Sequence, residues 1–220
     1  MPDPRQAPRR LKVRLILLKS SLLARLAAAV LFLAPLTPAQ ADDHGRPVGP
    51  WQVEAWGGFL NPDDFTSIMF TPWNTEIRSE GIFGIGAGRE VYDFGYGFSL
   101  DLGLLAAHRP DEGGYEVGLP ATFNYDLPWR ETLPMRLRVA IGPSYITTIT
   151  PTERRKDDDN QGSKLLNMFS PEVEVGLPGA PEFNAFVRLH HRSGIFGLID
   201  GVTGGSTYVT GGVRYRFGIE

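Results

Sequence analysis

Large apolar residues alternate with small or polar residues along most of the chain from Trp51 onward. The clearest example runs from Phe94 to Leu104, where Phe, Tyr or Leu occupies every second position and glycine, serine or aspartate lies between. Successive side chains of a β-strand point to opposite faces, so this period of two predicts strands with one apolar face. Helical periodicity of useful length does not appear between them. The pattern predicts eight strands, at about 51–60, 81–92, 94–106, 115–126, 136–149, 164–177, 182–193 and 207–217.

The connections between these strands alternate in length. Asp93 joins the second and third strands, 178–181 joins the sixth and seventh, and 127–134 joins the fourth and fifth. The connections at the other end are longer, and they comprise 61–80, 107–114, 150–163 and 194–206. This asymmetry is typical of an all-β, antiparallel up-and-down transmembrane β-barrel whose termini face the periplasm. The charged run at 153–159 is interpreted as a solvated part of one long loop.

The polar faces of the predicted strands carry charges of both signs at the strand centres. These charged residues are Glu54, Asp101, Glu116, Arg136, Arg138, Glu172, Glu174, Arg188, Arg214 and Arg216. Eight strands enclose an interior that side chains just fill, and buried charges need partners, so we expect an ion-paired plug inside. Aromatic residues near the strand ends fit an interfacial girdle. A soluble lipocalin-like barrel with an apolar interior is the alternative. The three residues after Phe217 also depart from the aromatic end of most outer-membrane assembly signals.

The start of the chain differs from the rest. A basic segment precedes an apolar stretch, Leu22 to Leu36, and small residues then lead to Ala41. A membrane anchor is one interpretation, but the apolar stretch is shorter than the roughly 20 residues of a helical span. The pattern instead predicts a signal peptide at 1–41 cleaved after Ala41, a linker at 42–50, the barrel at 51–217 and a tail at 218–220.

The amino-acid composition limits the partners and the kinds of site that the chain can have. The net charge of -3 gives no indication of a nucleic-acid partner. Cysteine is absent, which excludes disulfides, thiolate catalysis and cysteine-based metal sites. With only four histidines in the chain, neither a metal nor an organic cofactor is implied.

A histidine and a serine share the apolar face of the strand at 182–193. His191 and Ser193 have the parity of Leu189, whereas His190 and Arg192 have the opposite parity. Residues two apart on a strand lie about 6.6 Å apart along it, and a histidine beside a serine is the core of an activated nucleophile. The strand runs toward the long loops, so we expect the pair near the outer leaflet, where lipopolysaccharide lies. A polar belt that grips phosphate without catalysis is the alternative.

The end of the chain resembles the PagL lipid A 3-O-deacylase family over about 182–217. The features that carry the resemblance are the triplet His191-Arg192-Ser193, the apolar strand before it, Gly197-Leu198 after it and the closing Arg214-Tyr215-Arg216-Phe217. The resemblance implies a small outer-membrane barrel with an exterior site that hydrolyses an ester-linked acyl chain of lipid A. It implies Ser193 as the nucleophile and His191 as the general base. The backbone N–H of Gly194 is expected to help hold the oxyanion.

Two departures from the family pattern keep other functions open. The family orients its histidine with a glutamate on the last strand, but 203–208 holds no acid, and Asp200 is the nearest carboxylate. Gly194 stands where the family has an asparagine. The loss of an orienting acid lowers a rate by orders of magnitude. A non-catalytic barrel with a lipid-binding, adhesive or structural role therefore remains open, as does a soluble periplasmic carrier. The expected partners are lipid A in the outer leaflet, the outer membrane and the barrel assembly machinery, and a homodimer is left open.

Overall fold

The computed structural model describes residues 50–129, 134–159, 161–177 and 179–218. The predicted signal peptide and nearly all of the predicted linker lie outside the described residues. The described part of the chain begins immediately before the first strand and comprises the barrel and its loops.

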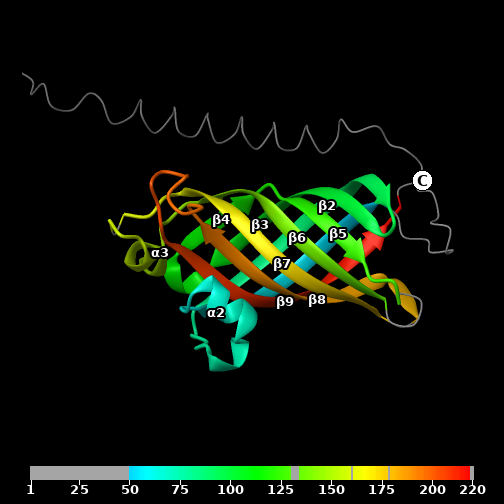
Figure 1. Cartoon of the computed structure of the whole chain (residues 1–220), viewed down its shortest axis with the longest axis horizontal. Helices are drawn as coiled ribbons and strands as arrows, with labels where there is room; N and C mark the ends of the chain where they lie inside the picture. The colour runs from blue at the N-terminus through cyan, green and yellow to red at the C-terminus, as the bar shows by residue number, and fades with distance from the viewer. Residues whose placement is uncertain (1–49, 130–133, 160, 178, 219–220) are drawn as a thin grey trace, which may run out of the picture. The chain divides into compact units, whose positions relative to one another are not determined.

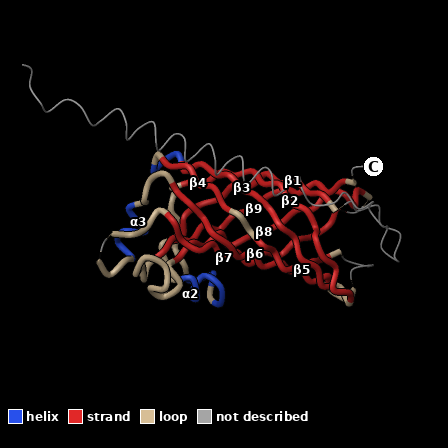
Figure 2. Tube along the Cα trace, turned by 90° about the horizontal axis from the view of Figure 1, so that it is seen from above, coloured by secondary structure: helices blue, strands red, loops and turns tan. Residues whose placement is uncertain are grey.

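Nine strand segments form one closed antiparallel barrel (Figures 1 and 2). They are β1 (Trp51–Asn61), β2 (Gly81–Gly95), β3 (Phe98–Arg109), β4 (Gly114–Gly118), β5 (Ala121–Asp126), β6 (Met135–Ile146), β7 (Leu165–Leu177), β8 (Ala180–Ser193) and β9 (Gly205–Phe217). Strands β4 and β5 both pair with β3 on one side and β6 on the other, so together they make one barrel strand. Pairing of β1 with β9 closes the sheet. The predicted eight-stranded antiparallel barrel is confirmed.

Two local features differ from the sequence prediction. The strand predicted at 115–126 is interrupted at Leu119 and Pro120, where proline has no N–H to donate to the ladder. The predicted turn at Asp93 is wrong, because β2 continues to Gly95 and the chain turns at Tyr96 and Gly97. Both turn residues have positive φ, 55° and 84°, which is the backbone of a two-residue hairpin turn. Phe94 therefore belongs to β2.

The apolar face of the sheet points outward. Phe98 and Phe123 are 50% and 52% exposed, whereas Asp101 and Glu116, which have the opposite parity, are each 1% exposed. A lipocalin-like carrier needs the reverse arrangement, with apolar residues lining the interior. The soluble-carrier alternative is therefore wrong, and the fold is that of a membrane barrel.

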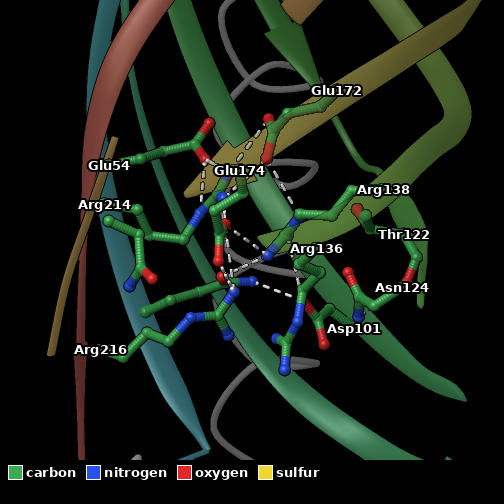
Figure 3. Close-up of polar contacts among 12 residues, drawn as sticks. Glu54, Asp101, Thr122, Asn124, Arg136, Arg138, Glu172, Glu174, Arg214 and Arg216 are labelled. Carbon is green, nitrogen blue, oxygen red and sulfur yellow. Dashed lines mark hydrogen bonds and ion pairs between the residues drawn. The ribbon is translucent and has the colours of Figure 1, made fainter. Parts of the chain in front are cut away.

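Charged side chains from opposite walls meet inside the barrel (Figure 3). The Arg188 guanidinium donates to Glu54 Oε1 at 2.8 Å and lies 2.6 Å from Glu172 Oε2. Arg214 donates to Glu172 Oε1 at 2.7 Å and also pairs with Glu174. Each of these ions is compensated by an opposite charge, which is the condition for burying it. The interior is thus a plug of ion pairs, as the sequence predicts.

Four short helical segments lie in the long connections. They are α2 (Phe65–Phe70), η1 (Pro72–Asn74), η2 (Pro110–Glu112) and α3 (Pro151–Lys156). Thr150 caps α3 by accepting a hydrogen bond from the N–H of Glu153 at 3.0 Å, which satisfies a free donor of the first turn. Within the part of the chain that the structure describes, no helix has the length and apolar character needed to cross a membrane.

The charged run at 153–159 is only partly solvated, which corrects the sequence interpretation. Glu153 is fully buried and lies 2.5 Å from the Arg192 guanidinium. Asp157 accepts hydrogen bonds from the N–H groups of Gln161, Gly162 and Thr203. These donations, with that of Gly162 the strongest, lower the pKa of Asp157 below its ordinary value. The run therefore ties the α3 loop to the rest of the barrel mouth.

Candidate active site on the outer wall

Five polar residues interrupt the apolar outer wall near the long-loop end. His191 lies opposite Thr207 of β9, and Thr207 in turn lies opposite Asn61 of β1. One step nearer the loops, Ser193 lies opposite Asn167 of β7. Residues directly opposite in an antiparallel pair share a face, and Cβ atoms of such pairs are about 4.5–5.5 Å apart. We call these five residues, Asn61, Asn167, His191, Ser193 and Thr207, the outer polar cluster.

Apolar side chains border the outer polar cluster on both sides along the strands. Leu165, two residues nearer the loops than Asn167 on β7, is 49% exposed. Val187, four residues nearer the periplasmic end than His191 on β8, is 60% exposed. The cluster thus lies within the apolar wall and not beyond its edge. Polar groups within a lipid-facing surface are costly unless they have partners or a function.

The hydroxyl of Thr207 orients His191. Thr207 Oγ1 and His191 Nδ1 lie 2.8 Å apart, and Thr207 is 1% exposed. With Nδ1–H donating to the hydroxyl, Nε2 keeps its lone pair and is the basic nitrogen of the ring. The ring of Phe65, at the start of α2, lies 4.6 Å from the imidazole, and it also contacts Phe169 edge-on at 5.6 Å. His191 is therefore held by the Thr207 hydroxyl, by a hydrogen bond to the Ser206 backbone and by the Phe65 ring.

Ser193 lies on the same face as His191, two residues further along β8, and its side chain is partly exposed. Among the described residues, no hydrogen bond joins the Ser193 hydroxyl to His191. Side chains two apart on one face are separated by about 6.6 Å at the backbone, so the two groups are neighbours on the wall without a bond between them. Catalytic hydrogen bonds often form only when substrate is bound.

Among the described residues, no hydrogen bond joins Gly194 or Asp200 to the side chains of His191 and Ser193. The N–H of Gly194 points to the carbonyl oxygen of Gly204, 3.4 Å from its nitrogen. The carboxylate of Asp200 accepts a hydrogen bond from the Ser163 hydroxyl at 2.6 Å. The loop folds back on itself through a bond from the N–H of Ile199 to the Gly194 carbonyl at 2.9 Å, which carries Asp200 toward Ser163. Thr207 is therefore a hydrogen-bond partner of His191, whereas Asp200 is bonded to Ser163.

The inward face of the same strand holds the backbone of the pair in place. Arg192, between His191 and Ser193, is fully buried and donates to Glu153 of α3 at 2.5 Å and to the Ser144 hydroxyl at 2.9 Å. His190 points inward as well, with Nε2 3.1 Å from Glu116 Oε1. The end of β8 is thus locked from inside, which fixes where the two outward side chains emerge.

A half-buried lysine links two of the long loops beside His191. Lys156, the last residue of α3, donates from Nζ to the carbonyl oxygen of Asp63 at 2.7 Å. Burial lowers the pKa of Lys156, an effect that the nearby Asp64 and Asp63 carboxylates oppose. Asp63 lies two residues before Phe65, so this bond helps to hold the Phe65 ring against His191.

Sequence reasoning identified His191 and Ser193 but not their neighbours. Thr207 and Asn167 have the outward parity of their strands, so the signal was present. Only the strand register shows that they lie beside the pair. Phe65 comes from a long connection that carries no period, and nothing in the sequence places it on the wall.

The structure is similar to solved outer-membrane barrels. The outer membrane enzyme PagL superposes with a TM-score of 0.50 at 16% identity, covering 76% of this chain and 99% of that protein. Neisserial surface protein A (NspA) gives 0.46 at 11% identity, covering 78% and 100%. The N-terminal β-barrel domain of Pseudomonas aeruginosa OprF gives 0.42 at 16%, covering 77% and 99%. No family model and no curated protein matches the sequence. The likeness to PagL shows the fold.

Proposed function

We propose that this protein is an outer-membrane ester hydrolase that removes an ester-linked acyl chain from lipid A, with Ser193 as the nucleophile and His191 as the general base. The observation that carries the proposal is the outer polar cluster, which places a histidine, a serine and an orienting hydroxyl together within an apolar, lipid-facing wall. The substrate class follows from that position, because an ester at this wall belongs to a membrane lipid. The resemblance of the end of β8 to the PagL family supports lipid A as that lipid.

The chemistry needs no group beyond the cluster, lipid and water. The Ser193 hydroxyl adds to the ester carbonyl as its proton passes to His191 Nε2. Collapse of the tetrahedral intermediate breaks the bond to the sugar oxygen, which leaves with that proton. Water then adds to the acyl-serine and gives a proton to His191, and the fatty acid departs as the proton returns to Ser193. In this scheme the Nδ1–H of His191 donates to Thr207 Oγ1, which leaves Nε2 to accept the proton.

Asn167 supplies a donor that the sequence motif lacks. Its side chain lies opposite Ser193 on the outer face of β7, whereas the Gly194 N–H points to Gly204. An amide N–H aimed at a developing oxyanion is worth about a hundredfold to a thousandfold in rate. We therefore assign the oxyanion to the Asn167 amide, with Gly194 as a second donor if its bond to Gly204 opens.

The test is mass spectrometry of lipid A after lipopolysaccharide is incubated with the folded protein in detergent. Wild type is expected to release one acyl unit, and Ser193→Ala and His191→Ala are expected to release none. His108→Ala is the matched control, because His108 also faces outward and stacks on Tyr115 without a serine two residues on. Heat-dependent gel mobility confirms folding of each variant. Unchanged lipid A with folded wild type would remove the deacylase proposal.

A non-catalytic lipid-binding barrel is the second candidate. The observation that favours it is the partner of His191, which is a hydroxyl and not a carboxylate. A hydroxyl orients imidazole but does not stabilise the imidazolium by charge. If lipid A binds to the wild-type barrel and is never cut, and binding falls in His191→Ala, this second function replaces the first.

A further inference from the structure

The first long loop leaves the barrel mouth and packs against the outside of the wall. We define the outer flap as residues 62–77, which contain α2 and η1 and project from the wall in Figure 1. Its inner side is apolar, since Ile68 is 3% exposed and Phe65 contacts the rings of Phe169 and His191. Both of those residues face outward from β7 and β8, on the surface that lipid contacts elsewhere in the barrel.

Polar bonds fix the outer flap in this place. The Asn61 side chain donates from Nδ2 to the Thr75 hydroxyl at 2.9 Å and accepts from the N–H of Asp63 at 3.0 Å. Asp63 Oδ2 also accepts from the N–H of Glu76 at 2.7 Å. Lys156 adds its bond to the Asp63 carbonyl. The flap is therefore a built part of the outer wall and not a loop extended into solvent.

The far side of the outer flap carries large apolar side chains that the other described residues leave exposed. Phe70, Trp73 and Ile77 are 68%, 77% and 62% exposed, and Met69 is partly exposed as well. Grouped exposure of this kind marks a surface for a partner or a membrane. A short amphipathic segment with Trp and Phe on its free side is typical of elements that lie in the membrane interface.

We propose that the outer flap is a membrane-inserted element whose Phe70, Trp73 and Ile77 side chains enter the outer leaflet beside strand β8. Lipid is the expected partner of these three exposed side chains, because the flap packs directly on the lipid-facing wall. Phe59 lies two residues before Asn61 on β1 and faces outward like it. Its side chain is 54% exposed and continues the apolar surface on the periplasmic side of the flap. The flap thus widens the bilayer contact of the barrel on the side of the outer polar cluster. This proposal does not rest on hydrolysis.

The absence of cysteine allows a direct test by site-specific labelling. Trp73→Cys is labelled with an environment-sensitive fluorophore, and the full barrel is refolded into phosphatidylcholine vesicles with or without phospholipids brominated on their acyl chains. Phe70→Cys is a second variant, in case one label disturbs the flap. Asp158→Cys is the matched control, because Asp158 is an exposed residue of another long loop. We expect brominated chains to quench the labels at 70 and 73 but not at 158, at a depth of roughly 5–10 Å.

Either of two results would overturn the proposal. Labels at 70 and 73 that are quenched by aqueous iodide as strongly as the label at 158, and not by brominated lipid, would place the flap in water. Shielding of these labels that rises with protein concentration, and not with lipid, would assign the face to a second copy of the chain.

Discussion

His190 and His191 are neighbours in sequence and lie in opposite environments. His190 points into the barrel, is 1% exposed, contacts the ring of Trp56 at 5.1 Å and pairs with Glu116. His191 points to the lipid side, and its partner is the uncharged hydroxyl of Thr207. The inner histidine binds a buried carboxylate through Nε2, and its Nδ1 has no hydrogen-bond partner among the described residues. The outer histidine is bonded through Nδ1 and shares its face with a serine. The same residue type thus has a structural role on one face of β8 and a candidate chemical role on the other.

The largest expected effect separates these two histidines. His191→Ala is expected to lower acyl release by orders of magnitude, because the general base is lost, while the melting temperature stays close to wild type. His190→Ala is expected to lower the melting temperature by leaving the buried Glu116 with one partner fewer, and acyl release below that temperature persists. Both variants are compared by product mass spectrometry and thermal unfolding. Equal loss of activity in the two folded variants would contradict a structural role for His190 and a chemical role for His191.

The next effect concerns the lock that holds the end of β8 from inside. Glu153→Ala removes the nearer carboxylate of the fully buried Arg192 and leaves it with Glu116, 3.9 Å away. Breaking a buried pair in this way costs about 3–5 kcal/mol. Urea unfolding in detergent measures the loss. Glu76→Ala is the control, since Glu76 is exposed and its removal is expected to change stability by no more than about 0.5 kcal/mol. If both variants unfold at the same urea concentration, the Glu153–Arg192 pair does not stabilise the end of β8.

A smaller effect is expected from the orienting hydroxyl. Thr207→Val keeps the shape of the side chain and removes its hydrogen bond to His191, a loss of about 1 kcal/mol that corresponds to a rate reduction of roughly fivefold. Thr207→Ser is the control, and it should retain most of the rate because the hydroxyl remains. Initial rates of fatty-acid release give both numbers. A full rate in Thr207→Val would show that His191 needs no partner.

The smallest effect is a pH response in the loop that follows α3. Hydrogen bonds from three backbone N–H groups lower the pKa of Asp157 in the folded protein, so these bonds stabilise the loop above the ordinary aspartate pKa. That stabilisation is lost as pH falls through the lowered value. Hydrogen exchange of the Gln161 and Gly162 amides is expected to accelerate in acid beyond the intrinsic change. In Asp157→Asn this additional acceleration should be absent, and its persistence would place the titration elsewhere.

Alternation, the charges on the polar face and the asymmetry of the loops together predicted the membrane barrel, because side-chain parity and loop length are local properties of the sequence. The same parity placed His191 and Ser193 outside and the arginines and glutamates inside. The neighbours that sequence reasoning missed depend on register. Thr207 meets His191 only through the pairing of β8 with β9, and Asn167 meets Ser193 only through the pairing with β7. Asp200 was the nearest carboxylate in sequence, but the fold of its loop carries it to Ser163.

The central claim is that the outer polar cluster activates Ser193, and covalent labelling with a lipid-like fluorophosphonate tests it most directly. The folded protein is treated with the probe, and the modified residue is located by peptide mass spectrometry. We predict a single adduct on Ser193 that is absent from Ser193→Ala and strongly reduced in His191→Ala, with His108→Ala unchanged. Folded wild-type protein that takes up no probe on Ser193, or takes it up equally without His191, would contradict the claim.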